Sequence, residues 1–366
     1  MEFVLSELSQ QVMTARAAKR PVFIRGGATK SFYGEIEGLE NISSYAVLDM
    51  SGYTGIVNYH PSELVMTARA GTLLSDIESV LHEHGQMLAF EPPRFGPGST
   101  LGGCVAAGLS GPRRMAAGSL RDFVLGVKLL DSSGSVLNFG GEVMKNVAGY
   151  DVSRLLAGSM GIFGALLEIS LKVVPRPVRE ATLALDLDEP AALARFGQWR
   201  GQPLPVSATA WHGAPGEGGG RLWVRLSGSA PAVANGVRKI GGQPVADDES
   251  AAFWDSLRDQ SHPFFQVLPL WRLALPPQAP ALGLGPTLIE WSGGQRWLAG
   301  PQDAVEVRNA AARQGGHATL FRYASKAADV PAFHPVGVSI LEVSRRLKQE
   351  LDPMGIFNPR RLFPEF

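Results

Sequence analysis

Glycine is concentrated in one stretch of this chain, and that concentration constrains the fold more than any other feature. Fifteen glycines lie between Gly96 and Gly164. Glycine loses more conformational freedom on folding than other residues, so such a run needs a backbone reason. Disorder does not supply it, because 45% of the residues are apolar and the net charge is zero, whereas disordered chains combine low hydrophobicity with high charge. We therefore expect folded loops in which the backbone itself has a task.

The charge balance excludes several kinds of partner. Lys plus Arg and Asp plus Glu number 34 each, so no global basic field attracts a nucleic acid. The longest nearly uncharged stretches fall short of the roughly 20 residues that a membrane span needs, and residues 1–20 have no apolar signal core. A single cysteine, Cys104, excludes an intramolecular disulfide and a cysteine-held cluster. These features predict a soluble cytoplasmic protein.

In the first half of the chain, helices and strands are mixed irregularly, which favours an α+β fold over a regular parallel sheet. Thr72 is expected to cap a helix that ends at Gly85. Phe123 to Phe139 reads as a hairpin that turns at Asp131 to Gly134. Further strands are expected at residues 21–25, 45–50, 63–69 and 165–174.

The second half predicts a different architecture. Its order of elements from Ala181 to Ile240 is β-α-β-β-α, part of a ferredoxin-like pattern, and a similar set follows up to Tyr323. A last amphipathic helix is expected over about Val338 to Leu351, where Ile340, Val343, Leu347 and Leu351 recur at helical spacing and form a packed face. Trp223, Trp271 and Trp297 fall on strands of this half, whose outer face is a candidate docking surface.

The first glycine segment leaves a strand and runs from Ile24 to Ser31, with Gly26 and Gly27 followed by hydroxyls and Lys30. Such a turn can aim several backbone N–H groups at a phosphate. An ordinary glycine turn explains the same residues equally well. A Walker A loop is excluded, because Thr29 stands where that motif requires glycine.

Two later glycine segments follow the first. The second runs from Phe95 to Gly111, and its glycines are spaced one residue too far apart for the Rossmann dinucleotide fingerprint. A Rossmann nicotinamide site is therefore not expected. Small residues here let the backbone run against an extended cofactor, with Ser99 and Thr100 as hydrogen-bond partners. The third segment runs from Lys145 to Gly164 and ends in Gly-Ser-Met-Gly-Ile-Phe-Gly.

Three such segments in this order resemble the FAD-binding domain of the vanillyl-alcohol oxidase and p-cresol methylhydroxylase superfamily, over about Pro21 to Pro175. The resemblance implies an α+β fold with a two-part FAD-binding domain at residues 1–177 and an α+β cap with ferredoxin-like elements at 178–335. The resemblance also implies that residues 336–366 return to the FAD-binding domain. Finally, it implies which residues bind FAD: Arg25, Gly26, Gly27, Ala28, Thr29, Lys30, Ser31, Pro97, Gly98, Ser99, Thr100, Gly102, Gly103, Ser110, Gly111, Gly118, Ser119, Asp122, Gly161, Ile162 and Gly164.

Within the superfamily, the segments at residues 90–98, 104–114 and 121–128 resemble the FAD-binding subunits of glycolate oxidase, and Leu351 to Pro359 resembles the superfamily's closing motif. This implies a complex that oxidises glycolate to glyoxylate with a catalytic flavoprotein subunit and an iron–sulfur subunit, and that reaches the membrane only through them. The chain itself would serve in electron transfer or assembly. Covalent members tether flavin through a histidine of the first loop, and residues 25–31 contain none, so noncovalent FAD is expected.

The cap lacks the histidine-rich Gly-Asp-Gly-Asn-x-His segment of the catalytic subunits, so no catalytic residue is assigned. One alternative is a self-sufficient FAD oxidoreductase of a small 2-hydroxy acid or alcohol, with His317 or Arg322 gripping a carboxylate. A second alternative is a flavin fold kept only as a scaffold. His82 and His84 are two apart on an expected helix and point in different directions, so no metal site is predicted.

Overall fold

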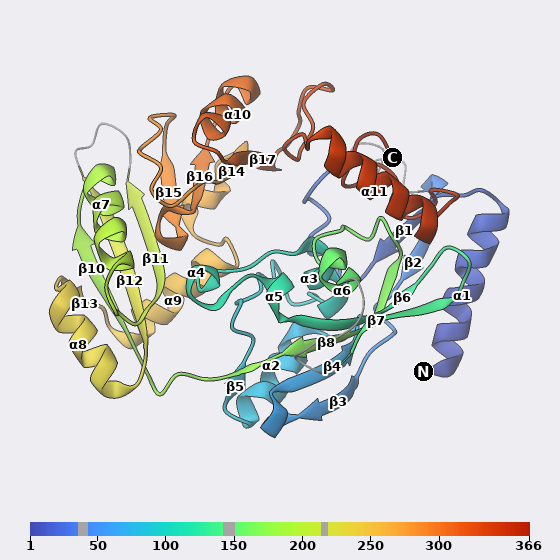
Figure 1. Ribbon diagram of the computed structural model, residues 1–366, viewed down its shortest axis with the longest axis horizontal. Coiled ribbons are helices and arrows are strands. Elements are labelled where there is room, and N and C mark those ends of the chain that lie inside the picture. Colours follow the sequence, from blue (N-terminus) through green and yellow to red (C-terminus); the bar gives the residue numbers. More distant parts are fainter. Residues whose placement is uncertain (36–42, 142–150, 214–218) are drawn as a thin grey trace.

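The computed structural model describes residues 1–35, 43–141, 151–213 and 219–366. Two antiparallel sheets of different size organise the described chain, five strands in the N-terminal part and eight strands in what we call the cap. Figure 1 shows the eight-stranded sheet beside the smaller one, with the C-terminal helix returning to the N-terminal part. The α+β class predicted from the mixed element order is confirmed.

The N-terminal part is built around a sheet in the order β3-β4-β8-β6-β7, and a separate parallel pair, β1-β2, stands before it. The hairpin predicted at Asp131 forms, because the Asp131 carboxylate accepts the N–H groups of Ser133 and Ser135. The strands and helices here are α1 (Glu2–Ala17), β1 (Val22–Arg25), β2 (Ala46–Asp49), β3 (Ile56–His60), β4 (Val65–Arg69), α2 (Leu74–Glu83), β5 (Gln86–Met87), α3 (Leu101–Ala107), α4 (Arg114–Ala117), α5 (Leu120–Phe123), β6 (Val124–Leu130), β7 (Val136–Gly140), α6 (Val152–Leu156), β8 (Ala165–Lys172) and β9 (Val174–Pro175).

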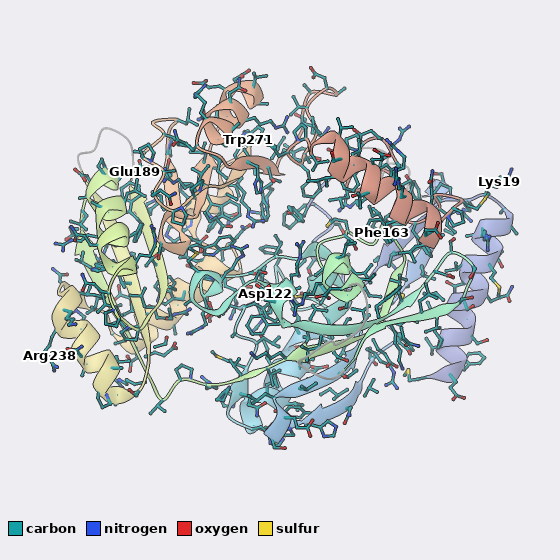
Figure 2. All side chains as sticks on the ribbon, in the orientation of Figure 1. Lys19, Asp122, Phe163, Glu189, Arg238 and Trp271 are labelled. Carbon is teal, nitrogen blue, oxygen red and sulfur yellow. The ribbon has the colours of Figure 1, made fainter. Side chains whose placement is uncertain are left out.

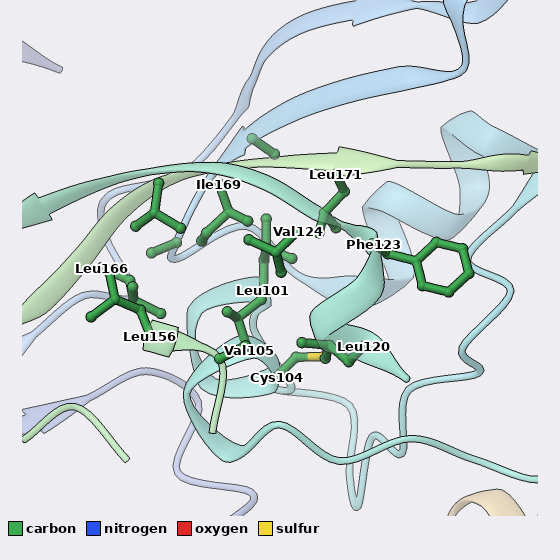
Figure 3. Close-up of a cluster of buried hydrophobic side chains, with 14 of the residues drawn as sticks. Leu101, Cys104, Val105, Leu120, Phe123, Val124, Leu156, Leu166, Ile169 and Leu171 are labelled. Atoms are coloured by element: carbon green, nitrogen blue, oxygen red, sulfur yellow. The ribbon is translucent and has the colours of Figure 1, made fainter. Parts of the chain in front are cut away.

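Helices α2 and α3 cover one face of this sheet and form its core. Leu101, Cys104 and Val105 of α3 pack against Ile169 of β8 and Val124 of β6, and all five are at most 1% exposed (Figure 3). Burying such side chains contributes about 1.5 to 3 kcal/mol each. The core therefore fixes the start of α3, where the second glycine segment enters the helix.

The cap sheet has the order β13-β10-β12-β11-β15-β16-β14-β17, with every pair antiparallel. Its first four strands have the ferredoxin-like arrangement that the sequence predicted, and the last four repeat that arrangement in mirror order, joined through β11 and β15. The elements are β10 (Arg179–Asp186), α7 (Glu189–Arg200), β11 (Val206–Gly213), β12 (Gly220–Gly228), α8 (Ala230–Ile240), β13 (Gln243–Pro244), α9 (Asp247–Arg258), β14 (Leu270–Ala274), β15 (Thr287–Glu290), β16 (Gln295–Ala299), α10 (Ala304–Arg313) and β17 (His317–Arg322).

The chain ends on the N-terminal part. Helix α11 (Val338–Leu351) has the predicted bounds, and the segment after it reaches β1, where Val22 pairs with Phe357 in a parallel bridge. The return of residues 336–366 thus has a physical basis, while domain limits at 177 and 335 stay predictions. Among the described residues, no helix combines the length and the apolar character that crossing a membrane would take.

Two local predictions differ from the structure. Thr72 does not cap α2, because its hydroxyl accepts the N–H of Gly55 instead. The packed face of α11 was predicted in part: Leu351 is 8% exposed and Leu347 packs against the core, but Ile340 and Val343 are 60% and 62% exposed, and Lys348 is buried beside Leu351. The helical spacing was right, but an apolar stripe alone does not say which neighbour covers it.

The expected tryptophan surface of the cap is also absent. Trp271, labelled in Figure 2, and Trp297 are 2% and 4% exposed. Trp223 is half-buried and stacks on Phe253 with ring centroids 4.0 Å apart. These rings fill the interior of the cap, so they offer no outer docking surface.

Candidate functional site

The first glycine segment forms a loop after β1, and the backbone of this loop lies in close contact with the backbone of the second glycine segment. A Cβ atom on Gly27 would lie 1.5 Å from the carbonyl oxygen of Gly98, so only glycine permits this approach. Ala28 has φ 55°, a left-handed conformation that is uncommon for a residue with a side chain. The N–H groups of Gly27, Ala28 and Thr29 make no hydrogen bond within the described chain.

A cavity of about 110 Å³ opens at this loop. It brings together all three glycine segments, and Asn358 and Arg361 complete it from the C-terminal end. Twelve of the residues predicted to bind the cofactor line it: Arg25, Gly26, Gly27, Ala28, Thr29, Lys30, Ser31, Thr100, Gly102, Gly103, Gly161 and Gly164. Unpaired N–H groups at a cavity wall are typical of an anion-binding loop, which favours that reading of the segment over an ordinary turn.

Lys30 and Ser99 tie the first loop to the second. The Lys30 ammonium donates to the Ser99 hydroxyl at 2.7 Å and to the carbonyl of Arg94 at 3.3 Å. Burial lowers the pKa of Lys30. Ser99 is 2% exposed, and Thr100 caps α3 by accepting the N–H of Gly103. Lys30 and Ser99 therefore connect the two loops, Thr100 orders the start of α3, and Ser99 lines neither this cavity nor the second one described below.

Two site residues come from the C-terminal segment and were missed by the sequence analysis. Asn358 accepts the N–H of Ile24 at 3.0 Å and donates to the carbonyl of Met160 at 2.7 Å. It thereby joins β1 to the third glycine segment. The closing motif at Leu351 to Pro359 could have pointed to Asn358, because it contains this residue. The spacing of residues in the motif does not show which distant segments Asn358 contacts.

Arg361 lies beneath the first loop. Its guanidinium donates to the carbonyls of Ser31 and Glu35. Burial lowers the pKa of Arg361 to about 10, so it still carries its charge at neutral pH. Arg361 therefore places a fixed positive charge at the wall of the cavity, beside the first loop.

The third glycine segment contributes less than predicted. Gly161 and Gly164 line the cavity with φ of 73° and 152°. Ile162 is 0% exposed and packs in the core, so its side chain faces away from the cavity. The segment was predicted to begin at Lys145, and residues 145–150 lie outside the described residues.

A second, wider cavity of about 630 Å³ adjoins the first, and Ala107 lines both. It lies between the N-terminal part and the cap. Ser110 and Ser119 of the predicted set line it, together with His317 and three arginines: Arg114, Arg121 and Arg272. The two cavities together suit an extended ligand whose narrow part lies at the glycine loop and whose broad part faces the cap.

The other predicted cofactor residues line neither of these two cavities. The carbonyl of Gly98 packs on Gly27, and a Cβ atom on Gly111 would lie 2.3 Å from the carbonyl of Glu91. Asp122, labelled in Figure 2, forms a capping box with Ser119 at the start of α5. The remaining two lie at an outer groove and beside that box: Pro97 and Gly118.

The two cap residues proposed to grip a carboxylate are separated. His317 lines the second cavity, and burial and the Arg272 charge lower the pKa of its ring. Arg322 lies outside both cavities, where it donates to Gln260 at 2.8 Å and sits 4.4 Å from the ring of Phe32. Of the two, only His317 therefore lies where it could meet a ligand in the second cavity. Among the described residues no cluster of His, Cys, Asp or Glu has the makings of a metal site.

Comparison with known proteins shows which family this chain resembles. Residues 5–140 match the FAD binding domain family. The chain is 43% identical over 362 residues to glycolate oxidase subunit GlcE of Escherichia coli, covering 98% of this chain and 97% of that protein. It is 29% identical to a D-lactate dehydrogenase of Archaeoglobus fulgidus, over 48% of this chain and only 38% of that protein.

A solved structure of alkyldihydroxyacetonephosphate synthase has the same fold, with a TM-score of 0.66 at 16% identity, over 98% of this chain and 76% of that chain. The unpaired loop N–H groups and the charge of Arg361 fit the diphosphate of FAD, and the wider cavity adjoins that site at Ala107. FAD is thus the cofactor of this fold. The chain belongs to the family of glycolate oxidase subunit GlcE, within the FAD-binding superfamily of the vanillyl-alcohol oxidase and p-cresol methylhydroxylase type.

Proposed function

We propose that this chain is an FAD-containing subunit of a glycolate oxidase complex, in which it serves electron transfer or assembly. The observation that carries the proposal is the 43% identity to glycolate oxidase subunit GlcE over nearly the full length of both chains. A second relative, 31% identical over 35% of this chain, is glycolate oxidase subunit GlcD of Bacillus subtilis. The partners would be a catalytic flavoprotein subunit and an iron–sulfur subunit, and any contact with the membrane would pass through them.

FAD would be held without a covalent bond. The first loop contains no histidine, and Cys104 is buried in the α3 core, where burial raises the pKa of its thiol to about 12. A thiol with so high a pKa is a poor nucleophile, because the thiolate is the reactive form. FAD bound to this chain should therefore be released intact by denaturation, with no flavin left on the protein.

The test is coexpression of the chain with candidate catalytic and iron–sulfur subunits, followed by flavin and iron analysis of the purified complex. We expect one FAD attributable to this chain and glycolate-dependent reduction of an electron acceptor. Absence of flavin from the folded chain, even after added FAD, would contradict the proposal. If a variant that lacks FAD assembles and turns over normally, the chain is a scaffold instead.

A self-sufficient oxidoreductase is the second candidate, and the arginine-lined second cavity favours it. That cavity is lined in part by cap residues and adjoins the cofactor cavity at Ala107. Anaerobic addition of glycolate or D-lactate to the isolated FAD-loaded chain distinguishes the two. Bleaching of the flavin absorbance would establish independent activity, and an unchanged spectrum would assign the oxidation step to a partner.

A further inference from the structure

Three arginines converge on the second cavity from two parts of the chain. Arg114 lies on α4 and Arg121 on α5, both in the N-terminal part, and Arg272 lies on β14 of the cap. In the part of the chain that the structure describes, none of the three forms an ion pair with a carboxylate. Charged side chains that are partly desolvated normally have a counter-ion, so this cavity has an excess of positive charge to explain.

Arg114 and Arg272 share one aromatic ring. Their Cζ atoms lie 4.4 Å and 5.4 Å from the ring centroid of Trp291, which places two like charges close together. Burial and the charge of Arg272 lower the pKa of Arg114. The ring offsets part of the repulsion, because a cation over an aromatic face gains about 0.5 to 2 kcal/mol. An anion between the two guanidinium groups would offset far more of it.

Trp291 is held in place as a platform for these two arginines. It is 3% exposed, its indole N–H donates to the carbonyl of Gly111 at 3.0 Å, and the N–H of the next residue, Ser292, donates to Thr209 at 2.8 Å. Its φ is 55°, which is rare for so bulky a residue. Strained backbone persists where the surroundings determine it, and such positions cluster at ligand sites.

The neighbouring acids offset only part of this charge. The Asp122 carboxylate is close enough to act on Arg114, but it accepts its hydrogen bonds from Ser119 and forms no ion pair with Arg114. Glu290 precedes Trp291, but its carboxyl is buried and accepts hydrogen bonds from Trp297 at 2.7 Å and Gln295 at 2.9 Å. Burial raises the pKa of Glu290 to about 7, so a large share of it is uncharged at neutral pH. Glu365 lines the cavity but is exposed. The cavity therefore keeps an excess of positive charge, which a bound anion would offset.

We propose that the second cavity binds a small carboxylate anion between Arg114 and Arg272. A guanidinium group pairs with a carboxylate through two parallel hydrogen bonds, and the cap supplies one such group while the N-terminal part supplies the other. The site itself follows from this chain's own residues. The choice of a carboxylate over another anion rests on the proposed function, which does not by itself require this chain to bind an acid.

The experiment is calorimetric titration of the full chain with oxalate, which cannot be oxidised by a hydride transfer and so reports binding alone. Arg114→Gln and Arg272→Gln should each weaken oxalate binding about tenfold or more, because each removes a hydrogen-bonded charge. Arg114→Lys keeps the charge and should retain part of the affinity. Flavin content and melting temperature are recorded for each variant, so a misfolded variant is recognised and Arg114→Lys then carries the test.

Arg221→Gln is the matched control, because Arg221 also lies over a tryptophan ring, at 5.0 Å from Trp223, but on the exposed side of the cap. It should leave the dissociation constant unchanged. The site is overturned if wild type binds no oxalate, or if neither cavity variant weakens binding. Equal binding of inorganic phosphate would overturn the carboxylate assignment. A chain without FAD contradicts the proposed function instead, and calorimetry still tests the site.

Discussion

At the scale of single residues, the glycines of the site mainly make room for other parts of the chain. Gly27 accommodates the carbonyl of Gly98, Gly26 the hydroxyl of Thr100, and Gly102 the side chain of Ala70. These positions were predictable from the sequence, but the space beside them was expected to hold the cofactor. The difference arises because a glycine pattern shows where the backbone needs room, and only the fold shows which atom occupies that room.

Gly27→Ala tests this. The added methyl group cannot coexist with the Gly98 carbonyl, so the two loops must move apart, at a cost of about 1 to 3 kcal/mol and with loss of FAD. Gly52→Ala is the control, because a Cβ atom there meets nothing within 4 Å. Flavin absorbance per chain and the melting temperature are the measurements. A Gly27→Ala protein with full flavin content would show that the loop contact is dispensable.

The raised pKa of Glu290 predicts that the stability of the folded chain depends on pH. Its folded-state pKa of about 7 lies above the ordinary value of 4.5, so the folded chain holds this proton more tightly than the unfolded chain. Wild-type stability should therefore fall as pH rises from about 4.5 to 7, by at most roughly 3 kcal/mol. Glu290→Gln does not titrate, so its advantage over wild type should grow between pH 5 and pH 8 in denaturant unfolding. A pH-independent difference would refute the assignment.

At the scale of elements, the C-terminal end of α11 connects segments that line the first cavity. The Lys348 ammonium lies 2.7 Å from the Asp352 carboxylate and also donates to the carbonyls of Ile162 and Phe357. Asp352 in turn accepts the N–H of Phe357 at 2.8 Å. This buried ion pair connects the last helix, the third glycine segment and the strand-like tail.

Lys348→Met leaves Asp352 charged and buried without its partner, so we expect a loss of about 3 to 5 kcal/mol and weaker FAD retention. Arg346→Met on the same helix removes an exposed pair with Glu342 and should cost about 0.5 kcal/mol or less. Urea unfolding and flavin release compare the two. Similar losses in both variants would mean that burial of the Lys348 pair does not matter.

Elements with a strong local signal were predictable. The Asp131 turn, the bounds of α11 and the ferredoxin-like order of the cap all follow from nearby residues. What could not be predicted depends on pairing across the chain. Thr72 bonds to Gly55, and Asn358 joins Ile24 to Met160, contacts between segments that no periodicity relates. The site was therefore predicted at its loops and missed at its C-terminal wall.

At the scale of the whole molecule, a buried charge network fixes the cap on the N-terminal part. Glu91 accepts from Arg225 of the cap at 2.8 Å and from the N–H of Arg113 at 2.8 Å, while Arg113 reaches Glu180 at 2.7 Å. Burial raises the pKa of Glu91, but the charges of Arg225 and Arg113 outweigh that effect and lower it. The second cavity depends on this alignment, because residues of both parts line it.

Glu91→Gln should therefore loosen the cap. Loss of the carboxylate charge leaves the buried charges of Arg225 and Arg113 without their full counter-charge, which should lower the free energy of unfolding by about 3 to 5 kcal/mol. We also expect faster proteolysis in the connection around Pro177. Asp49→Asn, which breaks the exposed pair with Arg25, is the control. Calorimetry that shows one unchanged transition in Glu91→Gln would count against a coupling role for the network.

The parallel bridge between Val22 and Phe357 has a consequence for synthesis. The first wall of the cofactor cavity leaves the ribosome early, whereas Asn358 and Arg361, which close that cavity, are translated more than three hundred residues later. We therefore predict that nascent chains and prematurely terminated products, which lack this wall, do not retain FAD. Flavin loading would then follow translation of the tail, and flavin content would report whether a chain was made through to that point.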